Sequence, residues 1–194
     1  MLEYKQSLPL APIKLIIYYQ VFLLVLFNLD YKKRIVSFVR QRGKIAIFGL
    51  GNEYRKDDGA GIAVIRLLKH SGIEKVEEVA LFEVDRNLLR YLSDIEKFQP
   101  SRIIFVDAAN LGTEQGKIMV LNGKQIIEKK ISTHENNLDL AMAYFKIVLP
   151  EHKILFVGIQ FKSLEMSDEL TLTEETNKAV KKLVRLLTVA VLKR

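Results

Sequence analysis

Two adjacent aspartates, Asp57 and Asp58, stand near the end of the segment GLGNEYRKDDGAG, residues 49–61. The segment follows the apolar run KIAIF and precedes the apolar run IAVIRLLK, so it is predicted to be a loop between a buried strand and a helix. Folds that bind nucleotides hold a phosphate at such a loop, whereas this loop ends in two adjacent negative charges. One aspartate could be the N-cap of the helix that follows. A helix needs one cap, so the second carboxylate points to another role.

Asp107 and His134 are the other candidates for chemistry. Asp107 stands in RIIFVDA, at the end of an apolar run, and Ser132 and Glu135 have the spacing of a capping box. Such a box would begin a helix and place His134 in its first turn. Since the positive end of a helix disfavours imidazolium, the ring would be neutral and able to bind a metal. Two carboxylates and an imidazole form a suitable ligand set for a divalent ion.

Each candidate also has an ordinary interpretation. Asp107 could be a surface residue at a strand end, and a lone histidine in the first turn of a helix is often without function. His70 and His152 look ordinary, because one lies near a helix end and the other just before a strand.

An alternation of strands and helices must position these residues. The expected strands are 44–50, 76–84, 102–108, 116–122 and 153–159, and the expected helices are 60–70, 86–98, 135–149 and 173–194. Near-continuous apolar strands that alternate with helices predict a three-layer α/β/α fold around a largely parallel sheet. Residues 41–194 are expected to form one domain. Ligands of such sheets bind beyond the carboxyl ends of the strands, where Asp58 and Asp107 are predicted to lie.

Composition excludes several classes of site. The 194 residues include no cysteine, which excludes disulfides, thiolate metal sites and a cysteine nucleophile and agrees with a reducing cytoplasm. The net charge is +7, but residues 1–56 hold 10 Lys and Arg against 3 Asp and Glu, while the remainder hold 20 against 20. Because the whole excess precedes the aspartate pair, we expect no nucleic-acid partner.

The first 40 residues are expected to form an apolar and basic helical extension. Leu15–Leu29 is a run of fifteen residues without a charge, shorter than the roughly 20 residues that span a membrane. No small-residue cleavage site follows it, which argues against a removed signal peptide. The extension could pack on the domain or on a partner, anchor the chain through residues 8–34, or reflect an upstream start that is not used. As an anchor, its KKR sequence at 32–34 would keep the domain at the inner face of the membrane. Otherwise a cytoplasmic location is expected.

Four segments together resemble the hydrogenase maturation endopeptidases. GLGNEYRKDDGAG is similar to the G-x-G-N…D-[DE]-x-x-G segment that opens this family, and PSRIIFVDAANLGTEQGKI resembles its second acidic segment. STHENNLDLAMAYF resembles its histidine segment, and KILFVGIQ with LTLTEETNKAVKKLV resembles its last strand and helix. The resemblance covers about residues 42–187, with the segments in order, and is closest to the formate-hydrogenlyase type.

The resemblance implies a protease that removes a C-terminal tail from the large-subunit precursor of a nickel–iron hydrogenase after nickel insertion. Asp58, Asp107 and His134 would contact nickel, and Asp58 and Asp107 would be catalytic. The residues that would organise the loop are Gly49, Gly51, Asn52, Asp57 and Gly59. Nickel is expected to arrive with the precursor, whose nickel-insertion chaperone is a second expected partner; an intrinsic metal stays open. Water would be activated by either aspartate as general base, or polarised by the metal.

The sequence departs from the family pattern at two places. After its second strand the family commonly has an acidic residue, a glycine and a threonine or serine. FEVDRNLL, residues 82–89, has neither the glycine nor the hydroxyl, and Glu83 or Asp85 would supply the acidic residue. The second departure is GIQF in place of GIQP at 158–161. Three other functions are alternatives. A nickel chaperone that does not cut remains open, a peptidyl-tRNA hydrolase shares only GLGN, and a dinucleotide site would need a glycine at Tyr54.

Overall fold

A five-stranded sheet forms the centre of the molecule. The computed structural model describes residues 30–85, 87–122, 125, 132, 135–149 and 152–194. The strands are β1 (Ile45–Leu50), β2 (Val79–Val84), β3 (Arg102–Ala109), β4 (Ile118–Asn122) and β5 (Lys153–Gln160), in the spatial order β2-β1-β3-β5-β4. All neighbours pair in parallel except β4, which runs antiparallel to β5 at the edge.

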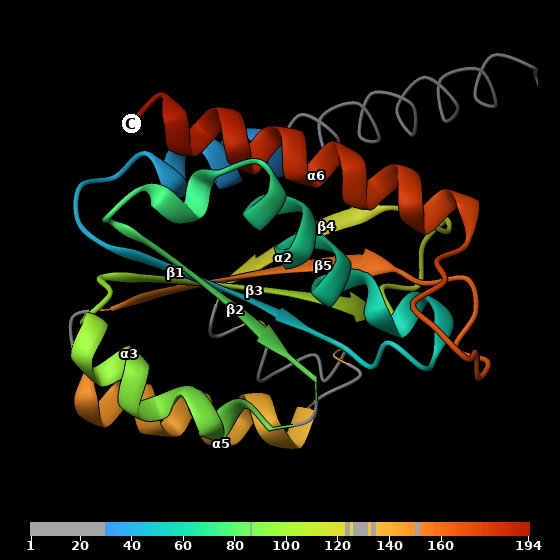
Figure 1. Cartoon of the computed structure of the whole chain (residues 1–194), viewed down its shortest axis with the longest axis horizontal. Coiled ribbons are helices and arrows are strands. Elements are labelled where there is room, and N and C mark those ends of the chain that lie inside the picture. Colours follow the sequence, from blue (N-terminus) through green and yellow to red (C-terminus); the bar gives the residue numbers. More distant parts are fainter. Residues whose placement is uncertain (1–29, 86, 123–124, 126–131, 133–134, 150–151) are drawn as a thin grey trace, which may run out of the picture.

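Helices cover both faces of this sheet (Figure 1). The helices α2 (Ala60–His70) and α6 (Glu174–Leu192) lie on one face, and α3 (Leu92–Phe98) and α5 (Glu135–Val148) lie on the other. The predicted three-layer α/β/α fold with a largely parallel sheet is therefore confirmed.

Each face of the sheet has its own hydrophobic core. Every residue of β1 and β3 is buried, as the continuous apolar runs predicted. Side chains alternate between the two faces. Towards α3 and α5 the core is aromatic, with the rings of Phe48 and Phe105 5.3 Å apart and that of Phe145 6.3 Å from both. Towards α2 and α6 the core is mainly aliphatic.

Three predicted starts differ by two or more residues from the observed ones. Strand β2 begins at Val79 instead of Val76, because Ile73–Lys75 form a 3-10 turn (η2). The helix predicted from residue 86 is a 3-10 turn (η3, Leu88–Tyr91) followed by the short α3, and the Asn87 side chain accepts a hydrogen bond from the N–H of Leu89 at the start of that turn. Strand β4 begins at Ile118 instead of the predicted Gly116. Gly116 has a φ of 72° and donates its N–H to Gln160 O.

Residues 30–39 are helical and pack against the core on the α6 side. Tyr31, Ile35, Phe38 and Val39 are buried. The buried Arg102 side chain donates to the carbonyl oxygens of Phe38 (2.8 Å), Val39 (2.7 Å) and Gly43. Burial, with a contribution from the nearby Arg194, lowers the pKa of Arg102 to about 10.

Part of the segment predicted as an extension, residues 1–40, thus belongs to the packed structure, while residues 1–29 lie outside the described residues. In the described part of the chain, no helix has both the length and the apolar character needed to cross a membrane.

Candidate active site

The candidate aspartates lie where the helical connections between strands switch from one face of the sheet to the other. From β1 the chain passes through α2 on one face to β2, and from β2 it passes through α3 on the opposite face to β3. In a parallel sheet, such a reversal opens a crevice at the carboxyl ends of the two strands concerned, here β1 and β3. Asp58 follows β1 and Asp107 lies near the end of β3.

Glycines let the start of α2 pack directly onto these two strands. A Cβ atom on Gly49 would lie 2.0 Å from the carbonyl oxygen of Gly61, and a Cβ on Gly61 would lie 2.3 Å from that of Val106. A Cβ on Gly51 would lie 2.4 Å from Asp58 O, which also accepts the N–H of Asn52 at 3.3 Å. The close packing brings the 3-10 turn η1 (Lys56–Gly59), which carries both aspartates, into contact with β3.

Asp57 ties this turn to the C-terminal helix. Its buried carboxylate accepts hydrogen bonds from the N–H groups of Lys162 (2.8 Å), Ser163 (3.1 Å) and Thr173 (2.7 Å) and from the hydroxyl of Thr173 (2.9 Å). Thr173 is the N-cap residue of α6. The interpretation of one aspartate as the N-cap of α2 is wrong, because the N-cap of α2 is Gly59 and makes no side-chain bond there.

Asp58 and Asp107 are both buried carboxylates. The Asp58 residue is 2% exposed, and its Oδ2 lies 3.9 Å from Nη1 of Arg55. Asp107 is fully buried and accepts a hydrogen bond of 2.5 Å from the hydroxyl of Ser132. The alternative of a surface residue at position 107 is therefore wrong. Both carboxylates are thus removed from solvent near the carboxyl ends of the adjacent strands β1 and β3.

Ser132 connects the histidine segment to β3. Besides its bond to Asp107, it forms an isolated antiparallel bridge with Ala109. Helix α5 begins at Glu135, as predicted, but His134 lies outside the described residues. The convergence of His134 with the two aspartates thus stays a prediction. Within the described ranges, no group of three or more His, Asp and Glu side chains is placed to hold a metal.

The other histidines contact backbone oxygens. Nδ1 of His70 lies 2.7 Å from Arg66 O on the same helix, and Nδ1 of His152 contacts Leu149 O. Both contacts are local to the ends of helices.

Glu83, at the end of β2, is engaged by two cations of α2. Its carboxylate accepts hydrogen bonds of 3.0 Å from Arg66 and from Lys69, and Arg66 also pairs with Glu53 at 2.8 Å. Burial raises the pKa of Glu83, but the bonds from Lys69 and Arg66 outweigh it and hold that pKa below its ordinary value. Glu83 therefore joins β2 to α2.

Gln160, in the sequence GIQF, is a residue to which the sequence pattern assigns no role. Its Oε1 accepts the N–H of Leu111 at 2.7 Å, and its Nε2 donates to Phe161 O at 3.1 Å. It thus positions the segment that follows Asp107. Leu111 is 49 residues away in the chain, so no local pattern in the sequence predicts this contact.

Comparison with known proteins identifies the family. The model of the family described as "Hydrogenase maturation protease" matches residues 62–190, about two thirds of the chain. This chain belongs to the hydrogenase maturation protease family. A Methanocaldococcus jannaschii protein provisionally named as such a protease is 28% identical over 150 residues, covering 73% of this chain and 88% of that protein.

Solved structures of hydrogenase maturation proteases share the fold. HycI of Thermococcus kodakarensis has a TM-score of 0.70 at 24% identity, covering 81% of this chain and 97% of that one. HybD of the same organism has a TM-score of 0.63 at 26% identity, covering 74% and 95%. HybD of Escherichia coli has a TM-score of 0.63 at 20% identity, covering 77% and 93%.

As a maturation protease, the chain is a hydrolase of peptide bonds. The resemblance to peptidyl-tRNA hydrolases, which rested on GLGN alone, is not supported by the family match. The match begins at Ile62, four residues after Asp58. Asp58 lies outside the matched residues, so the role proposed for it is supported by its burial and by its position after β1.

Proposed function

We propose that this protease removes the C-terminal tail from the large-subunit precursor of a nickel–iron hydrogenase once nickel has been inserted. The observation that carries the proposal is the placement of two buried carboxylates, Asp58 and Asp107, at the carboxyl ends of adjacent strands. Membership of the maturation protease family supplies the reaction class.

The precursor's nickel is the cation that this pair would recognise. Carboxylate oxygens are common ligands of divalent ions, and the neutral imidazole proposed at His134 would add a nitrogen ligand suited to nickel. Nickel held in the precursor would therefore dock against Asp58 and Asp107 and place the tail in the crevice. A precursor without nickel would lack this attachment and would be a poor substrate.

Cleavage requires a water molecule that attacks the carbonyl carbon of the scissile peptide bond. Asp58 or Asp107 accepts the proton of this water as general base, and the nitrogen of the leaving peptide then takes up a proton. The two carboxylates would also fit an intrinsic divalent ion, which could polarise the scissile carbonyl. Comparing nickel-loaded with nickel-free precursor separates the two sources of metal.

Purified protease is mixed with nickel-loaded and with nickel-free precursor, and loss of the tail is followed by mass spectrometry. We expect cleavage of the loaded precursor only, and no rescue when zinc is added to the protease with the nickel-free precursor. Equal cleavage of both precursors would refute nickel gating and favour an intrinsic metal or an aspartate-dependent reaction. Binding of the loaded precursor with the tail left attached would identify a chaperone instead.

A further inference from the structure

Arg55 places a positive charge beside Asp58 on the same loop. Its Nη1 atom lies 3.9 Å from Oδ2 of Asp58, and its side chain is 42% exposed, whereas that of Asp58 is 2% exposed. Among the described residues this is the ion pair that Arg55 forms, and its guanidinium donates no hydrogen bond to a described group. At this distance the two groups attract each other as charges, without a direct hydrogen bond. A cation that faces solvent thus partly neutralises a carboxylate of the candidate active site.

The backbone on both sides of Arg55 is fixed by the segment that follows β5. Ser167 donates its N–H to Tyr54 O at 2.9 Å, and the side chain of Lys56 pairs with Glu165. Lys56 has a φ of 41°, a left-handed conformation that costs free energy in a residue with a side chain. These contacts hold the loop in a conformation in which the guanidinium of Arg55 lies beside the buried carboxylate.

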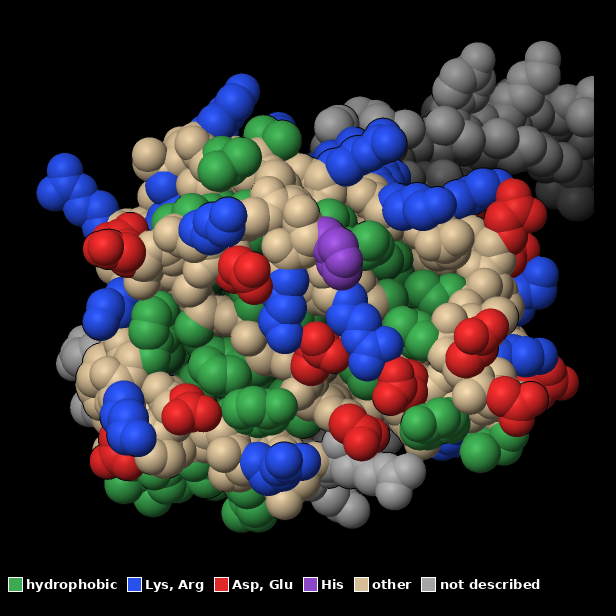
Figure 2. Space-filling model, viewed as in Figure 1, with side chains coloured by type: hydrophobic (Ala, Val, Ile, Leu, Met, Phe, Trp, Pro, Cys, Tyr) green, Lys and Arg blue, Asp and Glu red, His purple; other side chains and the backbone are tan. Residues whose placement is uncertain are grey.

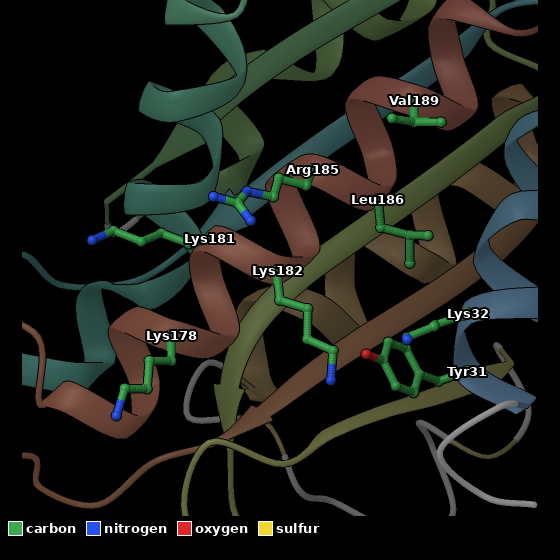
Figure 3. A pocket seen from close by; sticks show the side chains of 8 residues that line it. All are labelled: Tyr31, Lys32, Lys178, Lys181, Lys182, Arg185, Leu186 and Val189. Atoms are coloured by element: carbon green, nitrogen blue, oxygen red, sulfur yellow. The ribbon is translucent and has the colours of Figure 1, made fainter.

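A separate group of cations lies along α6. Figure 3 shows a groove between helix 30–39 and α6, and Lys and Arg side chains gather over α6 on the visible face of the molecule (Figure 2). The cations that line this groove are Lys32, Lys178, Lys181, Lys182 and Arg185. None of them belongs to the loop that carries Asp58. Arg55 is therefore distinct from this basic surface, and its charge acts on the carboxylate 3.9 Å away.

A guanidinium and a divalent ion compete for the same carboxylate oxygen. An ion held by Asp58 would also lie close to the positive charge of Arg55, and the repulsion would weaken its binding. A free ion gains only its contacts with the site, whereas nickel carried by the precursor is accompanied by contacts between the two proteins. Those contacts can offset the cost of displacing Arg55, whose long and exposed side chain is able to rotate into solvent.

We propose that Arg55 keeps Asp58 from holding a divalent ion of its own, so that the ion at this site arrives with the precursor. The proposal rests on the function proposed above, in which nickel in the precursor docks at Asp58 and Asp107. It adds a residue that selects the source of the metal. Arg55 acts through Asp58, as a positioning residue.

Metal binding to the free protease tests the proposal. The full-length chain is titrated with nickel chloride or zinc chloride in a buffer without chelators, and the heat of binding is measured. We expect Arg55→Gln to bind either ion about 5- to 10-fold more tightly than the parent chain, because it loses both a competitor for the carboxylate and a positive charge beside the ion. Arg55→Lys keeps the charge and should remain close to the parent chain. The gain should disappear in the double variant Arg55→Gln, Asp58→Asn.

The matched control is Lys56→Gln, which removes the same charge from the next residue. Because Lys56 pairs with Glu165 instead of Asp58, the affinity of this variant for either ion should stay within about twofold of the parent value. Zinc inhibition gives a second measurement, in which cleavage of nickel-loaded precursor is compared with the rate of the same chain without zinc. Inhibition of Arg55→Gln should need about 5- to 10-fold less zinc than inhibition of the parent chain or of Lys56→Gln.

Three results would overturn the proposal. The first is equal metal affinity of the parent chain and Arg55→Gln, and the second is an equal gain in Lys56→Gln. The third is a gain that persists when Asp58 is also replaced. Failure of the proposed function would look different, because the parent chain would then leave the tail of nickel-loaded precursor attached. The titration needs no precursor and would still show whether Arg55 shields Asp58.

Discussion

The hydroxyl of Ser132 donates a hydrogen bond to Oδ2 of Asp107, 25 residues earlier in the chain. The bond is 2.5 Å long, and both residues are buried. A carboxylate held by a buried donor keeps one rotamer, so the position of Asp107 depends on the segment that also contains His134. The second acidic segment and the histidine segment are therefore coupled in this fold.

Replacing Ser132 tests that coupling. In Ser132→Ala the carboxylate of Asp107 loses a buried donor, and we expect cleavage of nickel-loaded precursor to fall about 10- to 100-fold, as for a lost supporting contact of a metal ligand. Ser132→Thr keeps the hydroxyl and should retain most activity. Single-turnover rates check the prediction. Equal loss in both variants would show that packing at this position matters, and the hydroxyl does not.

Asp57→Asn should destabilise the protein. The carboxylate accepts four hydrogen bonds from the segment 162–173, and an amide nitrogen in place of either oxygen would face N–H donors. We expect a loss of about 1–3 kcal/mol in the free energy of unfolding, because a buried donor is left without its acceptor. Urea denaturation measures it. An unchanged midpoint would mean that these bonds contribute little.

Asp58→Asn and Asp107→Asn should behave differently from Asp57→Asn. Each amide keeps the shape of the side chain but removes the negative charge that a divalent ion requires, so tail removal should be abolished. His134→Ala should have the same effect if the imidazole binds nickel. The melting temperature should stay near that of the parent chain in all three variants. His70→Ala and His152→Ala are the controls, and normal processing by either carboxamide variant would rule out its role at the site.

Shortening the chain should separate residues 1–29 from residues 30–43. A chain that begins at Asp30 should keep its melting temperature. A chain that begins at Lys44 should be unfolded or insoluble, because it loses four buried side chains worth about 1.5–3 kcal/mol each, comparable to the whole stability of a domain. Arg102 would also lose the carbonyl acceptors of Phe38, Val39 and Gly43. Circular dichroism and thermal melts test this, and a folded chain from Lys44 would contradict it.

The pattern of apolar residues predicted the strands and helices of each layer well, because this pattern reflects which side chains are buried. The runs at 45–50 and 102–109 are apolar throughout since both faces of β1 and β3 are covered, and α6 shows a clear apolar stripe. The start of α3 was predicted too early because Asn87, which begins the 3-10 turn, lies inside an otherwise helical pattern.

The roles of the two adjacent aspartates could not be separated by spacing. The partners of Asp57 lie 105 to 116 residues away, and nothing in residues 49–61 points to them. The same holds for the contact between Asp107 and Ser132, because the spacing of Ser132 and Glu135 suggested a helix cap instead. Local sequence identifies polar residues at strand ends, whereas their partners are determined by the tertiary fold.

The long separation between Asp57 and Thr173 has a consequence for how the enzyme is made. The loop that carries Asp58 is closed by a segment near the C-terminus, 116 residues further along the chain. Contacts between residues so far apart in the sequence form late in folding. Closing such a long loop costs conformational entropy, and this cost is offset only when most of the chain is ordered. During translation, the loop cannot close before Thr173 has left the ribosome. A nascent chain that ends before Thr173 would therefore have its sheet partly built but no competent site, and proteolysis would begin only after this residue has been made.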